Sequence, residues 1–400
     1  MLTQDNIKVP VLVWVVLGFT FLAAFVPGSI LGFNVSGLSW FLPLFIASVI
    51  LVQRSSKVSF PIWLWLPWVG LLLLQLVVVD TVFLDPRVNP LQRTVQLLTP
   101  LVVGVAISTY PINIGALERI SNIFGKSVYI LFGGAFFSAM ATILAGFPTG
   151  LAAQAMTSLL LGVFFINRYL LMKSILDLRF YLLMAVLPLM ALTRTVMAVV
   201  LLAAPLSLAP MKLVRRFTII GLFVAIGIGL FYLPQVQQKM FYSGQGELSD
   251  ISLDNPDFAT SGRSFMWKVV GASADSSPWF GHGTGTAESI TYGIAGLAYP
   301  HNDWLLTYHD YGLVGVVIFL LCNLGMLSHC YISSQKTQNQ TIRLFFLAGA
   351  SSFIPFMLVM FTDNIMVYAS FFGNLQYLII GLAYGALQYQ RENTLKERQG

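Results

Sequence analysis

Charged residues are scarce in this chain of 400 residues. Only 10% of the residues are Asp, Glu, Lys or Arg, whereas 57% are hydrophobic and the mean hydropathy is +0.79. A soluble globular domain has about 25% charged residues, because its surface must be covered with polar groups. The composition therefore excludes that class and indicates a polytopic membrane protein whose main solvent is a bilayer.

Cysteine and histidine are also scarce, with two and four residues. Cys322 and Cys330 are eight positions apart on one expected helix, about 12 Å along its axis and too far for a disulfide between them. The sequence has no Asp-x-Asp motif and no His or Cys cluster with the spacing of metal ligands. We therefore expect neither a metal site nor a cofactor.

Apolar runs long enough to cross a bilayer, about 17 to 25 residues each, recur along the chain. We expect about twelve transmembrane helices, at 11–27, 37–53, 59–79, 94–110, 126–146, 150–166, 180–193, 195–210, 217–233, 311–328, 343–362 and 365–388. The first run has no convincing signal-peptide cleavage site after it, so we interpret it as a retained span. The expected fold class is an all-α polytopic membrane protein.

Charge decides between one helix and two in the stretch 180–210, because Lys and Arg favour cytoplasmic loops. With two helices, 16 of the 22 Lys and Arg residues are cytoplasmic, whereas a single crossing leaves 11 inside, 10 outside and Arg194 between them. Both termini are then cytoplasmic.

Membrane orientation also explains the net charge of +6, so we expect no nucleic-acid partner. The outer cations are Arg87, Arg93, Arg194, Lys239, Arg263 and Lys268.

This topology divides the chain into three segments. Residues 1–233 contain the first nine helices, and residues 311–400 contain the last three helices and a cytoplasmic tail. Between them, residues 234–310 form one large polar loop on the outer face, between helices nine and ten. This loop is the only stretch large enough to be an extramembrane active-site element.

Arg194 lies between two apolar runs, where a cation costs about 2.5 to 3.5 kcal/mol on membrane-insertion scales. A cost of that size implies an anionic partner or a water-filled cavity. Guanidinium groups bind phosphate oxygens bidentately, so Arg194 and Arg263 are candidates to neutralise a diphosphate without a metal. For Arg87 and Arg93 a snorkelling or loop position is the simpler interpretation, and substrate contact is the alternative.

His301 follows Pro300 and stands within ten residues of the next expected span, at the membrane interface. The usual histidine pKa, about 6.5, suits a general base at neutral pH. A helix cap or a surface position is the alternative interpretation. His282 and His309 are expected to be structural, and His329 falls on the cytoplasmic side.

Four motifs together resemble the O-antigen ligase and O-antigen polymerase superfamily, over residues 190–325. They are Thr193-Arg194, Gly262-Arg263-x-x-x-Trp267, Ser277-Pro278-Trp279-Phe280-Gly281-x-Gly283, and His301-Asn302-x-x-Leu305 leading into Gly312-x-x-Gly315. Asp310 stands where a glutamate is expected before the glycine pair, which leaves the role of that position open.

The resemblance implies a C-type glycosyltransferase-like fold in the bacterial inner (cytoplasmic) membrane, with a periplasmic active site. Such an enzyme transfers a glycan from undecaprenyl diphosphate to an acceptor hydroxyl, without metal. By match to the motifs, Arg194 and Arg263 would clamp the diphosphate and His301 would deprotonate the acceptor. Asn302 would orient the acceptor, and Trp267 and Trp304 would pack against sugar faces or, alternatively, against protein.

The acceptor distinguishes a polymerase, which uses a second lipid-linked glycan, from a ligase, which uses lipid A core. Residues 234–300 carry three cations against six acids. A net negative loop fits a mostly neutral glycan better than a phosphate-rich core, so we favour the polymerase. A transporter or flippase for the same lipid-linked glycan is a further alternative, but such proteins often have internal repeats and this sequence shows none.

The charge distribution makes the topology testable. A reporter that is active only in the periplasm should work when it is fused near Ser252 and fail near Lys336. Measuring reporter activity in cells that produce each fusion at equal levels would check this. The opposite pattern would exclude the topology with about twelve spans and an extracytoplasmic site.

Overall fold

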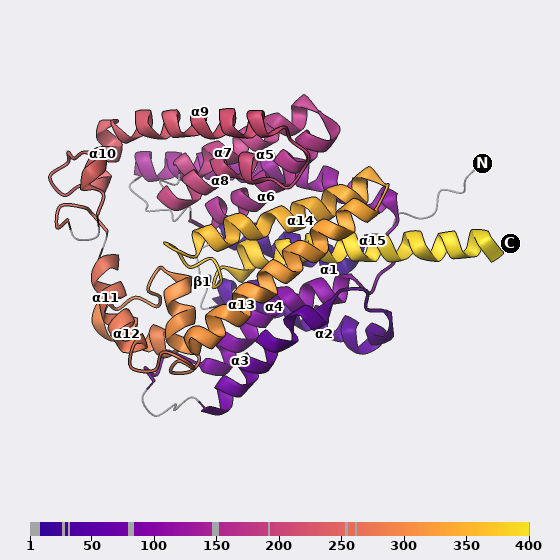
Figure 1. The fold of residues 1–400 in the computed structure, drawn as a ribbon, viewed down its shortest axis with the longest axis horizontal. Coiled ribbons are helices and arrows are strands. Elements are labelled where there is room, and N and C mark those ends of the chain that lie inside the picture. The colour runs from indigo at the N-terminus through magenta and orange to yellow at the C-terminus, as the bar shows by residue number, and fades with distance from the viewer. Residues whose placement is uncertain are drawn as a thin grey trace.

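The computed structural model describes residues 9–25, 29–30, 33–78, 84–145, 152–190, 193–252, 255–260 and 262–399. This part of the chain is almost entirely helical (Figure 1). The long helices overlap the expected spans: α1 (Val11–Phe25), α2 (Val35–Arg54), α3 (Leu66–Val78), α4 (Pro90–Ile107), α5 (Ile114–Ala145), α6 (Ala152–Met172), α7 (Ile175–Met190), α8 (Arg194–Leu206), α9 (Leu213–Phe231), α13 (Asp303–Lys336), α14 (Gln340–Val359) and α15 (Asn374–Gln399).

Shorter elements connect the long helices. They are β1 (Ser29–Ile30), β2 (Phe33–Asn34), η1 (Ser55–Lys57), η2 (Ile62–Trp65), α10 (Pro234–Met240), η4 (Leu248–Asp250), α11 (Arg263–Ala274), α12 (Thr286–Ala295) and η5 (Ala369–Gly373), of which η5 is a π-helix. The two strands pair antiparallel, Ser29 with Asn34 and Ile30 with Phe33.

The described helices confirm a polytopic membrane protein. Eight of them are long and apolar enough to cross a bilayer, by length and composition alone. Three shorter apolar helices lie at Val11–Leu22, Ile62–Val77 and Thr195–Leu206. The doubtful stretch 180–210 holds two separate helices, because α7 ends at Met190 and α8 begins at Arg194. The full count of about twelve spans stays a prediction.

The centre of the bundle is formed by α6, α14 and α15, whose membrane-length segments are 78%, 78% and 89% buried. Small residues let these helices approach closely. At Gly381 of α15, an added Cβ would lie 2.4 Å from the Gly104 carbonyl oxygen of α4. By contrast, α9 lies along the edge of the bundle (Figure 1), and none of its membrane-length segment is buried.

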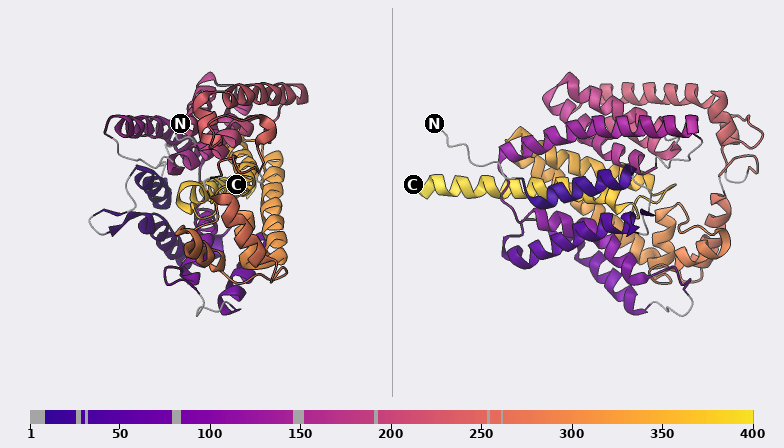
Figure 2. Two further views of the ribbon diagram at one scale, coloured as in Figure 1. Left: turned by 90° about the vertical axis from the view of Figure 1, so that its left-hand side faces the viewer. Right: turned by 180° about the vertical axis from the view of Figure 1, so that it is seen from behind.

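The segment between α9 and α13, with α10, α11 and α12, gathers at one end of the bundle. The C-terminal part of α15 projects from the opposite end (Figures 1 and 2). A small apolar cluster of Val270, Ala287 and Leu306 packs α11 and α12 against the first turns of α13. The segment is therefore a folded layer fixed to the bundle.

Helix α13 begins at Asp303, earlier than the expected start at 311. Its N-cap is Asn302, whose side-chain oxygen accepts a hydrogen bond from the Leu305 amide at 2.9 Å. An asparagine in this position satisfies one of the amide groups left without a partner at a helix start. The expected boundary between loop and span, at 310/311, lies next to a break in this element, at Gly312.

Gly312 breaks the regular backbone of α13, with φ 64° and ψ −171°. The turn segment 278–283 lies against this break and supplies the missing backbone partners. Its bonds are Leu313 N to Pro278 O at 2.8 Å, Val314 N to Trp279 O at 3.1 Å, His282 N to His309 O at 2.9 Å and Gly283 N to Asp310 O at 2.8 Å. Because buried backbone groups need partners, the break and the segment depend on each other.

The two glycine-rich motifs meet at this contact, and backbone proximity explains their glycines. A Cβ at Gly312 would lie 2.3 Å from the carbonyl group of Trp279, and one at Gly281 would lie 2.5 Å from the carbonyl group of Asp310. Both glycines also have positive φ, 64° and 70°. Side chains are therefore excluded by steric overlap and by backbone conformation.

Replacing Gly312 with Ala should destabilise the protein strongly. Strained backbone of this kind costs about 1 to 3 kcal/mol by itself, and the steric overlap with Trp279 adds to it. Thermal unfolding in detergent should show a clearly lower midpoint. Gly271→Ala is the matched control, because an added Cβ meets nothing within 4 Å in α11 and alanine favours a helix. Equal midpoints for the two variants would contradict the explanation.

Candidate functional site

The connection between α14 and η5 brings two distant parts of the sequence together. Arg263 Nη1 donates a hydrogen bond to the Thr362 carbonyl oxygen at 2.6 Å. The Thr195 and Thr362 hydroxyl groups are hydrogen-bonded to each other at 2.5 Å. The first turns of α11 and α8 therefore meet at Thr362. Arg194 is the first residue of α8, but its side chain lies outside the described part of the structure.

The pattern of α11 orients Arg263. Met266, Val270 and Ala274 recur at four-residue spacing and are buried, which turns that face of the helix toward α12 and α13. Gly262 precedes the helix in the left-handed region, with φ 79°, where glycine is favoured. Arg263 is consequently the first helical residue, held at the corner where α11 meets the α14–η5 connection.

His301 contacts the same connection. Its Nδ1 lies 3.1 Å from Asn364 Nδ2 and 3.4 Å from Asp363 Oδ1. The Asn364 backbone amide donates to Asp363 Oδ1 at 2.9 Å and holds that carboxylate in place. The ring nitrogen Nδ1 therefore faces protein, whereas the side chain keeps 27% exposure. His301 also has φ 54°, an uncommon conformation for a residue with a side chain and one that is found at functional sites.

Trp267 supports the backbone beside His301. Its indole Nε1 donates to the Pro300 carbonyl oxygen at 2.6 Å. Trp304 donates to the Met357 carbonyl oxygen at 3.0 Å and packs between the rings of Phe319 and Phe361. Both tryptophans thus make contacts within the protein, and Asn302 caps α13. Contact of these three residues with a sugar stays a prediction.

Tyr368 adds a neutral hydrogen-bonding group to this region. Burial, reinforced by the negative charges of Asp363 and Asp303, raises its pKa to about 12, while the charge of Arg263 acts in the opposite direction. At neutral pH the phenol is therefore protonated.

Arg93 and Arg87 are both paired with carboxylates of the protein. Arg93 binds Glu288 of α12 through two hydrogen bonds, at 2.7 and 2.5 Å. Burial raises the pKa of Glu288, and the hydrogen bonds from Arg93 oppose that shift. Arg87 binds Asp85 twice at 2.8 Å, which lowers the pKa of Asp85 to about 2. The proposed contact of either arginine with substrate stays a prediction.

Sequence reasoning missed Thr362, Asp363 and Asn364, which organise this region. Their position in the sequence could have indicated them, because they are three polar residues where the expected span 343–362 ends and the span 365–388 begins. Nothing in the sequence links that turn to Arg263 or His301, which lie about 100 and 60 residues earlier. Among the described residues, no three His, Cys, Asp or Glu side chains are grouped so that they could hold a metal ion.

Comparison with known families supports the motif resemblance. Residues 180–320 match the family model described as O-antigen ligase. This range contains Arg194, Arg263 and His301, and it ends before the connection that carries Thr362. A comparison with curated proteins gives no match.

Proposed function

We propose that this chain is a membrane glycosyltransferase of the O-antigen ligase and polymerase superfamily, because residues 180–320 match the family model described as O-antigen ligase. Its donor is a glycan on undecaprenyl diphosphate and its acceptor is a sugar hydroxyl. The reaction takes place at the periplasmic face of the bacterial inner membrane. The meeting of Arg263, the start of α8 and His301 at residues 362–364 carries this proposal.

The proposed role of the arginines is to stabilise the negative charge that develops on the leaving diphosphate. The acceptor oxygen attacks the anomeric carbon of the donor sugar, the bond from that carbon to the diphosphate oxygen breaks, and the lipid diphosphate leaves with increased negative charge. Fixed cations stabilise a leaving group of this kind. Arg263 is held at Thr362 through one nitrogen, which leaves the rest of its guanidinium fork for phosphate oxygens. Arg194 starts the adjoining helix and is the second member of the proposed clamp.

His301 is the proposed base for the acceptor. Asp363 can only accept a hydrogen bond when ionised, and it lies 3.4 Å from Nδ1. A proton on Nδ1 leaves Nε2 unprotonated, so that Nε2 accepts the proton of the attacking hydroxyl. Asp363 is the positioning residue in this scheme, because its carboxylate accepts the Nδ1 proton. The Asn364 side-chain nitrogen, 3.1 Å from Nδ1, can only donate and does not select this tautomer.

The same proposal fixes the orientation in the membrane. The end of the bundle with α10, α11 and α12 is periplasmic, and the opposite end, where α15 projects, is cytoplasmic (Figure 1). The chain then crosses the membrane about twelve times with both termini inside. Residues 1–233 and 311–400 supply the membrane helices, and residues 234–310 supply the periplasmic layer.

Two acceptors remain as candidates. The net negative charge of residues 234–300, with three cations against six acids, supports a second lipid-linked glycan and hence a polymerase. The description of the matched family supports attachment to lipid A core and hence a ligase. We favour the polymerase, because a phosphate-rich acceptor would gain from a positive surface.

Arg263→Lys should lower glycan transfer about 100-fold or more, the scale on which loss of a transition-state charge contact lowers kcat. Lysine keeps the charge but loses the planar fork. His301→Ala should lower transfer at least as much, and Arg194→Lys should behave like Arg263→Lys. Transfer is measured with purified protein and a lipid-diphosphate-linked donor.

Lys268→Ala is the matched control, because Lys268 is an exposed cation on the same helix as Arg263. It should retain transfer. EDTA should also leave transfer unchanged, since arginines replace a metal in this scheme. Near-normal transfer by the arginine and histidine variants at wild-type protein levels, or a loss with EDTA that Mg²⁺ or Mn²⁺ restores, would contradict the proposal.

Deleting the gene separates the two acceptors. A polymerase predicts loss of long glycan chains with a single repeat still attached to its normal acceptor, because ligation continues. Electrophoresis of the surface glycans and extraction of lipid-linked glycans measure this. Full-length chains accumulating on undecaprenyl diphosphate, together with unmodified lipid A core, would identify a ligase.

A further inference from the structure

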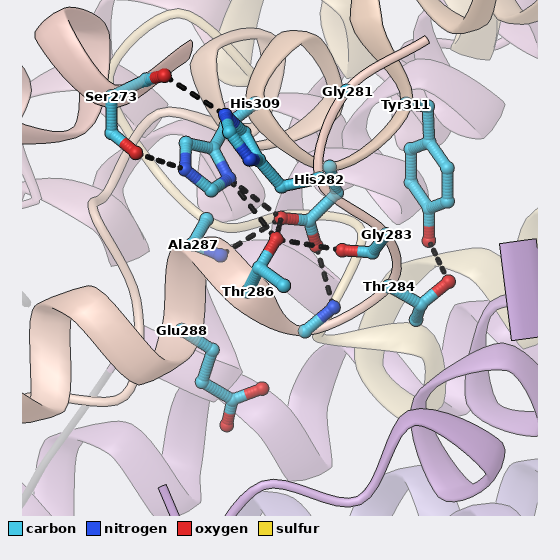
Figure 3. Close-up of polar contacts among 12 residues, drawn as sticks. Ser273, Gly281, His282, Gly283, Thr284, Thr286, Ala287, Glu288, His309 and Tyr311 are labelled. Atoms are coloured by element: carbon cyan, nitrogen blue, oxygen red, sulfur yellow. Dashed lines mark hydrogen bonds and ion pairs between the residues drawn. The ribbon is translucent and has the colours of Figure 1, made fainter. Parts of the chain in front are cut away.

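A second polar cluster lies at the far end of α11 (Figure 3). Ser273 is ten residues after Arg263 on this helix, about 15 Å along the axis at 1.5 Å per residue. His282, Thr286, His309 and Asp310 join it from the glycine-rich turn, α12 and α13. None of these side chains takes part in the glycan transfer proposed above.

The cluster contains a chain of hydrogen bonds from a hydroxyl group to a carboxylate. Ser273 Oγ lies 3.0 Å from His309 Nε2, and His309 Nδ1 lies 3.0 Å from Asp310 Oδ1. Figure 3 shows the His309 ring beside Ser273, with dashed lines marking the polar contacts. A nucleophile bonded to a base, with the base oriented by a third group, is the arrangement that activates serine for attack on carbonyl carbon.

The partners of Asp310 determine the proton positions. Its carboxylate accepts hydrogen bonds from the backbone amides of Gly285 and Ala287 at 2.7 and 2.8 Å. The Thr286 hydroxyl lies 3.0 Å from Asp310 Oδ1 and 2.7 Å from the Gly283 carbonyl oxygen. Backbone amides only donate, so both carboxylate oxygens act as acceptors and His309 Nδ1 must carry the proton. His309 Nε2 is then unprotonated in the neutral ring. The Ser273 hydroxyl therefore donates to Nε2, which is the direction that nucleophile activation requires.

His282 supplies a donor beside the same serine. Its ring stacks on His309 with centroids 4.7 Å apart. Its Nε2 lies 2.9 Å from the Ser273 carbonyl oxygen, which can only accept, so this nitrogen carries a proton. The Ser276 hydroxyl, 3.2 Å from the same nitrogen, is its second contact. A histidine N–H placed beside the nucleophile can stabilise a developing oxyanion.

Ser273 lines a pocket. The pocket holds about 600 Å³ of empty space including its open mouth, and Ser273, His282 and His309 line it. Leu84 and Ile290 form apolar parts of the wall, whereas Thr286 and Ser289 provide hydroxyl groups. Apolar and hydroxyl-bearing walls together fit a short acyl chain joined to a hydroxyl-rich alcohol.

We propose that Ser273, His309 and Asp310 form a second catalytic site, which hydrolyses short-chain carboxylic esters of sugar-like alcohols. Ser273 Oγ attacks the ester carbonyl carbon while His309 Nε2 takes its proton. The bond from that carbon to the alcohol oxygen breaks, and the alcohol leaves with the proton from His309. Water, deprotonated by His309, then attacks the acyl-serine and releases the carboxylic acid and the free serine.

A fluorophosphonate probe tests this directly on the purified full-length protein. Ser273 Oγ should displace fluoride from phosphorus, and mass spectrometry of the wild-type protein should find the adduct on the peptide that contains Ser273. Ser273→Ala should abolish the adduct. It should also lower hydrolysis of p-nitrophenyl acetate at least about 100-fold, on the scale of general-base catalysis. His309→Gln should lower both, since the base is removed.

Ser264→Ala is the matched control, because Ser264 is on the same helix and its hydroxyl group contacts Thr260 at 2.9 Å, away from the Ser273–His309–Asp310 chain. It should keep the adduct and the esterase rate. Arg263→Lys should also keep both, so failure of the glycosyltransferase proposal would leave this result unchanged. Two results would overturn the proposal: no label on Ser273 of the wild-type protein at millimolar probe, or equal esterase rates for wild type and Ser273→Ala. The cluster would then have a structural role only.

Discussion

The layer formed by α10, α11 and α12 depends on the backbone hydrogen bonds between residues 278–283 and the break in α13. A helix that is interrupted at Gly312 leaves amide and carbonyl groups without partners, and an apolar environment makes such groups costly. The turn segment 278–283 supplies those partners through main-chain atoms alone. Because the two backbones approach so closely, glycine is required on both sides. This contact fixes the turn before α12 against α13.

Two further interactions hold the layer from its other sides. Asp310, inside α13, accepts the first amides of α12, and Glu288, inside α12, is bound by Arg93 of α4. Each buried carboxylate is therefore matched by donors, as buried charge requires. Besides its contact with His309, Asp310 therefore holds the start of α12, at a position where the family resemblance leads one to expect glutamate. Its shorter side chain reaches the helix start directly.

The layer positions the proposed diphosphate clamp, because its helix α11 carries Arg263. One end of α11 presents Arg263 to the α14–η5 connection, and the same connection contacts Thr195 and His301. A charged group held by packed helices loses little freedom when a ligand binds, which favours transition-state stabilisation. The opposite end of α11 places Ser273 against His309. A single helix thus positions side chains of two separate clusters.

The sequence by itself determined the membrane class and the approximate helix positions, and its motifs pointed to the family that residues 180–320 match. Hydropathy is a local property that a bilayer selects, so spans such as 217–233 coincide with helices such as α9 without knowledge of any contact. The four motifs likewise identified Arg263 and His301 as candidates. Only the tertiary structure brought Thr362, Asp363 and Asn364 to these residues. It also paired Arg93 with Glu288 and Ser273 with His309, because contacts between distant segments follow from how helices pack and leave no periodic pattern in the chain.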